Sequence, residues 1–137
     1  MRVSERMSAP AITISPELSH HSALRLMQEH SMHHLPVVGA DGQLLGIVAE
    51  RDLLLAVAHY VQNPVEVAEV MKRDVVTVAP EMSLTEAASL MVRNKIGGLP
   101  VLGPDGRVVG VITETDIFAT FVAMAEAGQA FSIARGV

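Results

Sequence analysis

The chain has 137 residues, of which 50% are hydrophobic and 18% are charged, and its formal net charge is −5. This length suits one compact domain or two small units that share a core, and the composition excludes a disordered chain. The acidic balance argues against nucleic acid as a partner, because neutralising phosphates needs a basic face. The sequence contains no cysteine, which excludes a disulfide scaffold and a thiolate zinc site.

The apolar stretches of the chain are short. Residues 1–10 lack the apolar run of a secretory signal. The longest stretch without Asp, Glu, Lys or Arg is residues 53–65, and its 13 residues are too few to span a bilayer. We therefore expect a cytoplasmic protein that has no membrane partner.

The chain repeats itself at an offset of 64 residues. Residues 3–55 align without a gap on residues 67–119, and 19 of these 53 pairs are identical. The identical pairs include the Pro, Gly and Asp residues that punctuate secondary structure, so coincidence between two hydrophobic patterns is a poor explanation. The sequence therefore predicts an internal duplication.

Each copy begins with a short lead-in segment that ends at Met7 or Met71. A β-rich run follows at residues 11–14 and again at residues 75–78, and we expect each run to form a strand. Pro16 or Pro80 then ends the run.

A helix comes next in each copy. Ser19 and Ser83 are the predicted N-caps, and Ser83 with Glu86 has the spacing of a capping box. The apolar residues at helical spacing are Ala23, Leu24 and Met27 in the first copy, and Leu84, Ala87, Ala88 and Met91 in the second.

A hairpin and a second helix complete each copy. Two apolar strands are predicted at residues 35–38 and 44–49, with Asp41-Gly42 as turn residues between them. The second copy repeats this pattern at residues 99–102 and 108–113, and the final helices begin near Glu50 and Glu114.

The predicted fold class is therefore α+β, with two β-α-β-β-α repeats packed sheet to sheet in pseudo-two-fold symmetry. One copy alone buries too little surface to be stable, so the two are expected to share an interface. The expected units are residues 1–62 and 63–127, followed by a tail at 128–137, and Asn63-Pro64 is expected to break the helix before the second unit.

The order of these residues resembles a known family. In the second copy the resemblance is carried by Met71, Thr77-Val78, Pro80, Ser83, Gly98-Leu99-Pro100-Val101, Asp105-Gly106 and Gly110-Val111-Ile112-Thr113-Glu114-Thr115-Asp116. This order resembles a cystathionine β-synthase (CBS) domain, and two in tandem resemble a CBS pair, or Bateman module. The resemblance covers residues 3–125 and is greatest to stand-alone bacterial CBS proteins.

The resemblance implies a sensor of AMP, ADP, ATP or S-adenosylmethionine that needs no cofactor and acts on an unidentified effector protein. In this family a Ser/Thr-x-x-Asp segment holds the ribose, and the adenine lies between the repeats. Carried over by position, one cleft would use Thr113, Thr115 and Asp116, facing Ile12, Met32, His33, His34 and Leu35. The other would use Ala49, Arg51 and Asp52, facing Val76, Ile96, Gly97, Gly98 and Leu99.

The residues themselves leave two interpretations of Thr113-x-x-Asp116 open. A carboxylate can accept two hydrogen bonds from a ribose diol, but the same spacing also forms a capping box. The first copy departs from the pattern, because Ala49 replaces the hydroxyl residue while Arg51 adds a charge that could reach phosphate. Gly97-Gly98 would leave room where the first copy has His33-His34, so we expect the clefts to differ in ligand or affinity.

The sequence predicts neither a metal site nor a catalytic site. The six histidines could suggest a metal, but surface positions or ligand contact by His33 and His34 are favoured, and no metal site is predicted. No nucleophile elbow, phosphate loop or zinc-protease motif occurs, so no catalytic residues are predicted.

The final helices are apolar on more than one face, which predicts a homodimer through them, with burial against the other repeat as the alternative. A dimerising interaction scaffold with vestigial pockets is the competing function.

Overall fold

The computed structural model describes residues 1–59 and 64–128. The elements of the first repeat are η1 (Val3–Glu5), α1 (His20–His30), β1 (His34–Val38), β2 (Leu44–Ala49) and α2 (Glu50–His59). Those of the second are η2 (Val67–Glu69), α3 (Leu84–Asn94), β3 (Gly98–Leu102), β4 (Val108–Thr113) and α4 (Glu114–Glu126). The predicted α+β class and the internal duplication are confirmed. Residues 129–137 of the expected tail at 128–137, and most of the expected break near Asn63, lie outside the described residues.

The predicted serines cap helices α1 and α3. The Ser19 hydroxyl accepts a hydrogen bond from the Ser22 backbone N–H at 3.3 Å, and Ser83 accepts one from Glu86 at 3.1 Å. The return bond from the Glu86 side chain does not form between these described residues, so the predicted capping box is half formed. Each helix buries an alanine and a methionine of the predicted apolar stripe: Ala23 and Met27 in α1, Ala87 and Met91 in α3.

Two antiparallel hairpins form the sheets. Strand β1 pairs with β2 and β3 with β4, and each pair has a bulge at the same position of the repeat. Both turns need a left-handed residue, which Gly42 (φ 82°) and Gly106 (φ 83°) supply at no steric cost. The structure therefore reproduces the predicted hairpins and their turn residues.

The lead-in of each repeat packs into the core of the other repeat. Val3 is fully buried in the core of the second repeat, and its N–H donates to the Met82 carbonyl at 2.9 Å. Val67 and Met71 are buried in the core of the first repeat, where the Val67 N–H donates to Leu18 at 2.8 Å. The two cores are therefore interlocked, and a division of the chain at residue 62 does not separate them.

The predicted opening strands at 11–14 and 75–78 are shorter in the structure, where each contributes a single parallel bridge, Ile14 to Val37 and Val78 to Val101. The physical reason is the crossover between repeats. Ser8, just upstream, pairs with Val111 of the second repeat, so the segment that follows must travel to the first before it can pair again. Such a segment cannot maintain a continuous ladder.

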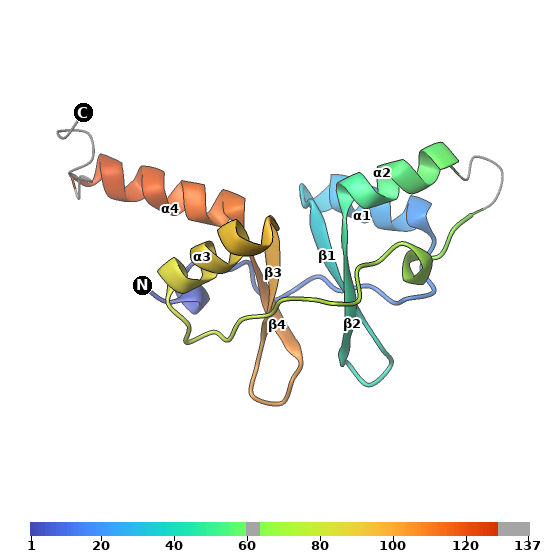
Figure 1. Cartoon of the computed structure of the whole chain (residues 1–137), viewed down its shortest axis with the longest axis horizontal. Coiled ribbons are helices and arrows are strands. Elements are labelled where there is room, and N and C mark those ends of the chain that lie inside the picture. Colours follow the sequence, from blue (N-terminus) through green and yellow to red (C-terminus); the bar gives the residue numbers. More distant parts are fainter. Residues whose placement is uncertain (60–63, 129–137) are drawn as a thin grey trace.

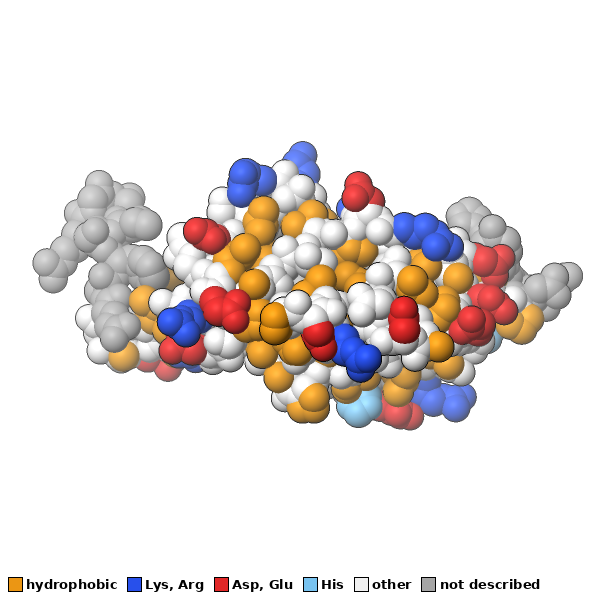
Figure 2. Space-filling model, turned by 90° about the horizontal axis from the view of Figure 1, so that it is seen from below, with side chains coloured by type: hydrophobic (Ala, Val, Ile, Leu, Met, Phe, Trp, Pro, Cys, Tyr) orange, Lys and Arg blue, Asp and Glu red, His pale blue; other side chains and the backbone are white. Residues whose placement is uncertain are grey.

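The two repeats lie side by side as two lobes (Figure 1). Helices α2 and α4 lie on one side of the molecule, and the turns of both hairpins project from the other. The face that carries the turns mixes hydrophobic side chains with acidic and basic ones (Figure 2). Among the described residues, none of the helices combines the length and apolarity that crossing a membrane requires.

Candidate functional site: two unequal clefts between the repeats

Two cavities lie where the repeats meet. The larger has a volume of about 850 Å³ and the smaller about 290 Å³. Four residues line both cavities and form the wall between them: His33, His34, Gly97 and Glu114. Ligand pockets in proteins commonly span roughly 300–1,000 Å³, so the larger cleft is well within this range and the smaller lies at its lower limit.

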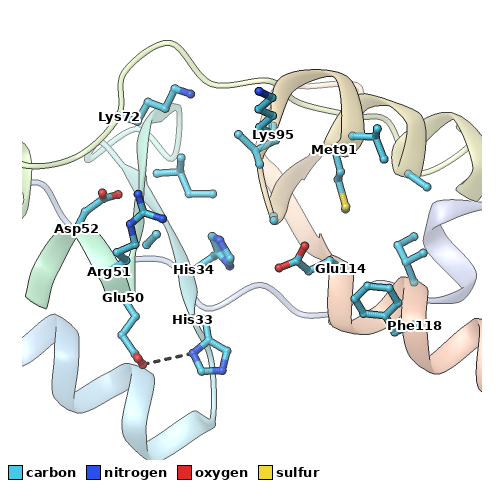
Figure 3. Close-up of a pocket in the computed structure, with 18 residues that line it drawn as sticks. His33, His34, Glu50, Arg51, Asp52, Lys72, Met91, Lys95, Glu114 and Phe118 are labelled. Carbon is cyan, nitrogen blue, oxygen red and sulfur yellow. Dashed lines mark hydrogen bonds and ion pairs between the residues drawn. The ribbon is translucent and has the colours of Figure 1, made fainter.

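The larger cleft combines side chains from both repeats (Figure 3). Arg51 and Asp52 come from the first turn of α2, and Lys72 comes from the segment after η2. Lys95 lies opposite, at the end of α3, and Phe118 enters from α4. The predicted residues Ile96, Gly97 and Gly98 also line this cleft. The structure therefore brings most of the second predicted set together.

The smaller cleft gathers most of the first predicted set. Thr113, Thr115 and Asp116 at the start of α4 line it together with Met32, His33 and His34. Its lining also includes Ser8 and Ser31.

Four predicted residues do not line either cavity. Leu35 and Leu99 are fully buried in the two hydrophobic cores. Ile12 and Val76 are half-buried and pack against the same cores. Met7 and Met71, which precede the predicted opening strands, also pack against core residues and not in the clefts. All six are apolar, and burial in a core satisfies their side chains.

The polar residues of the clefts that sequence analysis missed include Ser8, Ser31, Lys72 and Lys95. They belong to no recognised motif, and only the crossover and the helix ends place them at the seam. The 64-residue offset was the one signal in the sequence that relates these residues to one another, because it makes Ser8 equivalent to Lys72 and Ser31 equivalent to Lys95. Ser31 and Lys95 both take left-handed backbone (φ 53° and 54°) as the C-caps of α1 and α3.

Thr113 and Asp116 form the capping box that the sequence allowed. The Asp116 Oδ2 atom accepts from the Thr113 N–H at 2.8 Å and from the Thr113 hydroxyl at 3.0 Å. The Thr113 hydroxyl accepts in return from the Asp116 N–H at 3.4 Å. Asp52, the equivalent residue in α2, accepts no hydrogen bond from the described part of the chain, and Ala49 lacks the hydroxyl through which Thr113 makes two of these bonds. The first repeat therefore has the carboxylate at this position without the capping bonds.

His34 packs against the backbone of Gly98. A Cβ at position 98 would lie only 2.8 Å from His34 Cγ, and one at position 97 would lie 2.9 Å from Glu114 Oε1. The room that these glycines provide is therefore filled by His34 and Glu114 side chains.

Burial lowers the pKa of His34 from its ordinary value of 6.5. Glu114 opposes this change, His33 adds to it, and Asp52 opposes it. The imidazole at the wall between the clefts is therefore held toward its neutral form.

This lowered pKa predicts a pH-dependent stability. The unfolded chain binds a proton at His34 more readily than the native chain does, so His34 contributes stability above about pH 6.5. That contribution is lost as the pH falls through the lowered native pKa. We expect His34→Gln to reduce the decline of the free energy of unfolding between about pH 7.5 and about pH 5. Chemical denaturation across this range measures the decline, and an unchanged slope would contradict the prediction.

Two other histidines, His33 and His20, have local partners. His33 Nδ1 lies 3.3 Å from Glu50 Oε2 at one end of the larger cleft. His20 is buried, and its Nδ1 accepts a hydrogen bond from the Val65 N–H at 2.9 Å. Within residues 1–59 and 64–128, no three His, Asp or Glu side chains are grouped closely enough to hold a metal ion.

Comparison with known proteins gives a family match over most of the chain. The family model for the CBS domain matches twice, at residues 3–59 and 67–123. A CBS domain-containing protein of Dictyostelium discoideum is 34% identical, over 90% of this chain and 93% of the relative. An inosine-5'-monophosphate dehydrogenase of Korarchaeum cryptofilum is 40% identical over 78% of this chain, but the match covers only 21% of that enzyme. The chain thus spans about a fifth of the length of such enzyme relatives.

Solved structures share the arrangement of the two repeats. A CBS domain pair in complex with 5'-methylthioadenosine and S-adenosyl-L-methionine superposes with a TM-score of 0.83 at 32% identity, covering 90% of this chain and 97% of that one. CBSX2, from Arabidopsis thaliana, in complex with AMP gives a TM-score of 0.78 at 25% identity, covering 90% and 98%. Both neighbours hold adenosine compounds.

Proposed function

The chain belongs to the CBS domain family as a tandem pair, and on that premise we propose that it is a regulatory module that binds an adenine nucleotide or nucleoside between its repeats. The ligand class is AMP, ADP, ATP or S-adenosylmethionine. No cofactor and no catalytic step are part of this proposal. We place the protein in the cytoplasm, where an effector protein would respond to the bound state.

The observation that carries the proposal is the placement of Asp52 and Asp116. These two carboxylates occupy equivalent positions in the first turns of α2 and α4, and each lines one of the two clefts. A carboxylate at such a position can accept both hydroxyls of a ribose. Exposed N–H groups at a helix start favour a nearby phosphate. Two structural neighbours that hold adenosine compounds support the assignment.

Regulation follows from where the clefts lie. Each cleft is lined by residues of both repeats, so a bound ligand contacts both lobes at once. A ligand can shift an equilibrium only between conformations that it binds with different affinity. We propose that occupancy favours one relative angle of the lobes and that the exposed faces of α2 and α4 report this angle to a partner.

A thermal-shift series tests the proposed function. Binding to the native state raises the apparent melting temperature by mass action. The series compares adenosine, AMP, ADP, ATP and S-adenosylmethionine with guanosine and GTP as controls. A saturable rise with at least one adenine compound and none with the guanine compounds is expected. No rise with any adenine compound would contradict the proposal.

The exposed apolar side chains of α2 and α4 support a homodimer. The same side chains favour the alternative function, a dimerising interaction scaffold. Leu54 and Leu55 are each 53% exposed, and Phe118 and Val122 are 65% and 50% exposed. Both helices lie on the same side of the molecule (Figure 1). Exposed apolar surface of this kind is typical of interaction sites, and a second copy would cover it.

We expect Leu55→Glu and Val122→Glu to convert a dimer to a monomer, because each buries a charge in the proposed interface. Sedimentation equilibrium measures the mass in solution. Val92→Glu on α3, where the valine is 77% exposed, is the matched control and should remain dimeric. A wild-type chain that sediments as a monomer would contradict the dimer.

A further inference from the structure

The two clefts differ in charge at three symmetry-related positions. Residues that line the larger cleft include Arg51, Lys72 and Lys95. The residues 64 positions away in the sequence are Thr115, Ser8 and Ser31, and all three line the smaller cleft. At each of the three positions, the larger cleft has a cation where the smaller has a hydroxyl.

The three cations are available to a ligand. Among the described residues, none of the three has a carboxylate within ion-pair distance, since the ion pairs found are His33–Glu50 and Arg107–Asp105. Figure 3 shows Lys72 and Lys95 approaching one end of the larger cleft from opposite lobes, with the His33–Glu50 pair at the other end. Unpaired cations that converge on a cavity attract an anion with several charges.

The larger cleft also has three carboxylates, and none of them lies within ion-pair distance of the three cations. Glu50 is paired with His33, and Asp52 is the residue assigned to the ribose. Glu114 belongs to the wall shared with the smaller cleft, where it lies beside His34. Figure 3 places the two lysines at the end of the cleft away from Glu50 and Glu114, so the positive charge is concentrated there.

The smaller cleft has the opposite character. It contains no Lys or Arg among its described lining residues, it includes Glu114 and Asp116, and its volume is about a third of the larger one. A chain of phosphates would meet carboxylates there and no fixed cation. An adenosine compound without phosphate fits both its size and its charge.

We propose that the clefts sort adenine compounds by charge: the larger selects a nucleoside di- or triphosphate, and the smaller accepts an uncharged or cationic adenosine compound. This inference rests on the proposed function and adds to it a ligand class for each cleft. Arg51, Lys72 and Lys95 are the residues that distinguish phosphate number in the larger cleft.

The test replaces each cation with its symmetry-related residue. The triple variant Arg51→Thr, Lys72→Ser and Lys95→Ser keeps residues that the same fold accepts in the other repeat. The control variant Arg25→Ser, Arg73→Ser and Arg93→Ser removes the same charge from exposed positions outside both clefts. Titration calorimetry with adenosine and with magnesium-free ATP measures the affinities of all three proteins, and thermal unfolding verifies that each is folded.

We expect the wild-type chain to bind ATP at least about tenfold more tightly than adenosine, as charge-assisted hydrogen bonds allow. This preference should shrink between about 0.05 M and about 0.5 M salt, because the cations are exposed and screened. The triple variant should lose the preference for ATP and keep its affinity for adenosine, while the control variant keeps both.

Equal affinity of the wild-type chain for adenosine and ATP would overturn the inference and leave the proposed function intact. The same conclusion would follow if the triple variant kept the preference for ATP, or if the control variant lost it equally. Binding of neither compound would overturn this inference, whereas the proposed function would be overturned only if AMP, ADP and S-adenosylmethionine also failed to bind.

Discussion

Replacing Asp52 with alanine will weaken the binding of an adenine nucleotide about a hundredfold, because two hydrogen bonds from ribose hydroxyls to a carboxylate are lost. The free energy of unfolding should fall by no more than about 0.5 kcal/mol, the scale of a carboxylate in the first turn of a helix. Titration calorimetry and chemical denaturation of the same preparation measure the two quantities. An unchanged affinity would show that Asp52 does not hold the ribose.

Asp116→Ala provides the matched comparison. Asp116 closes the capping box with Thr113, whereas Asp52 accepts no hydrogen bond from the described residues. The Asp116 variant should therefore lose about 1 kcal/mol of stability through the cap itself. Any change in its ligand affinity must be corrected for this loss. The Asp52 variant needs no such correction, which makes the first repeat the cleaner place to test ribose binding.

Replacing Gly110 with alanine will lower the free energy of unfolding by about 3 kcal/mol through overpacking of the crossover. A Cβ at this position would lie 2.6 Å from Met7 Sδ and 2.8 Å from the Ser8 carbonyl oxygen. The Ser8 backbone is fixed at this point, because it pairs with Val111 in both directions at 3.0 and 3.1 Å. The added methyl group must displace the segment that joins the two repeats.

Gly103→Ala is the control for this prediction. Its Cβ would meet Val109 Cγ1 at 3.2 Å and Asp105 Oδ1 at 3.3 Å, both on side chains that can move. We expect a loss below about 1 kcal/mol there. Urea denaturation of both variants measures the difference. A Gly110 variant as stable as the Gly103 variant would show that the crossover is not tightly packed at β4.

The local elements of this fold follow from the sequence. Ser19 and Ser83 cap their helices, and Gly42 and Gly106 occupy the left-handed turn positions that the hairpins need. These features depend on contacts within a few residues, where side-chain chemistry and backbone geometry act directly. The 64-residue duplication adds a long-range constraint, because it implies that both halves fold alike. The equivalent positions of Asp52 and Asp116 at the starts of α2 and α4 follow from it.

The sequence places part of the lining of the two clefts, while the role of these residues in binding stays a prediction. Most predicted residues at the starts of α2 and α4, and before β1 and β3, do line the two cavities. Ile12, Val76, Leu35 and Leu99 instead pack in or against the cores, because a motif position does not specify which way a side chain points. Only the structure could show that Asp116 caps α4, since ribose binding requires the same spacing and stays a prediction.

The exchange of lead-ins and the grouping of the three cations in one cleft were decided by tertiary structure alone. Val3 and Val67 carry no signal that each belongs to the other repeat's core, because hydrophobic burial is nondirectional and favours any apolar site within reach. That exchange places Lys72 in the larger cleft, which Arg51 also lines. Lys95, the left-handed C-cap of α3, lines the same cleft from the opposite side. The sequence by itself determined the repeat, its helices and hairpins and the acidic residue of each cleft, whereas the crossing of the chain between repeats determined which cleft received the cations.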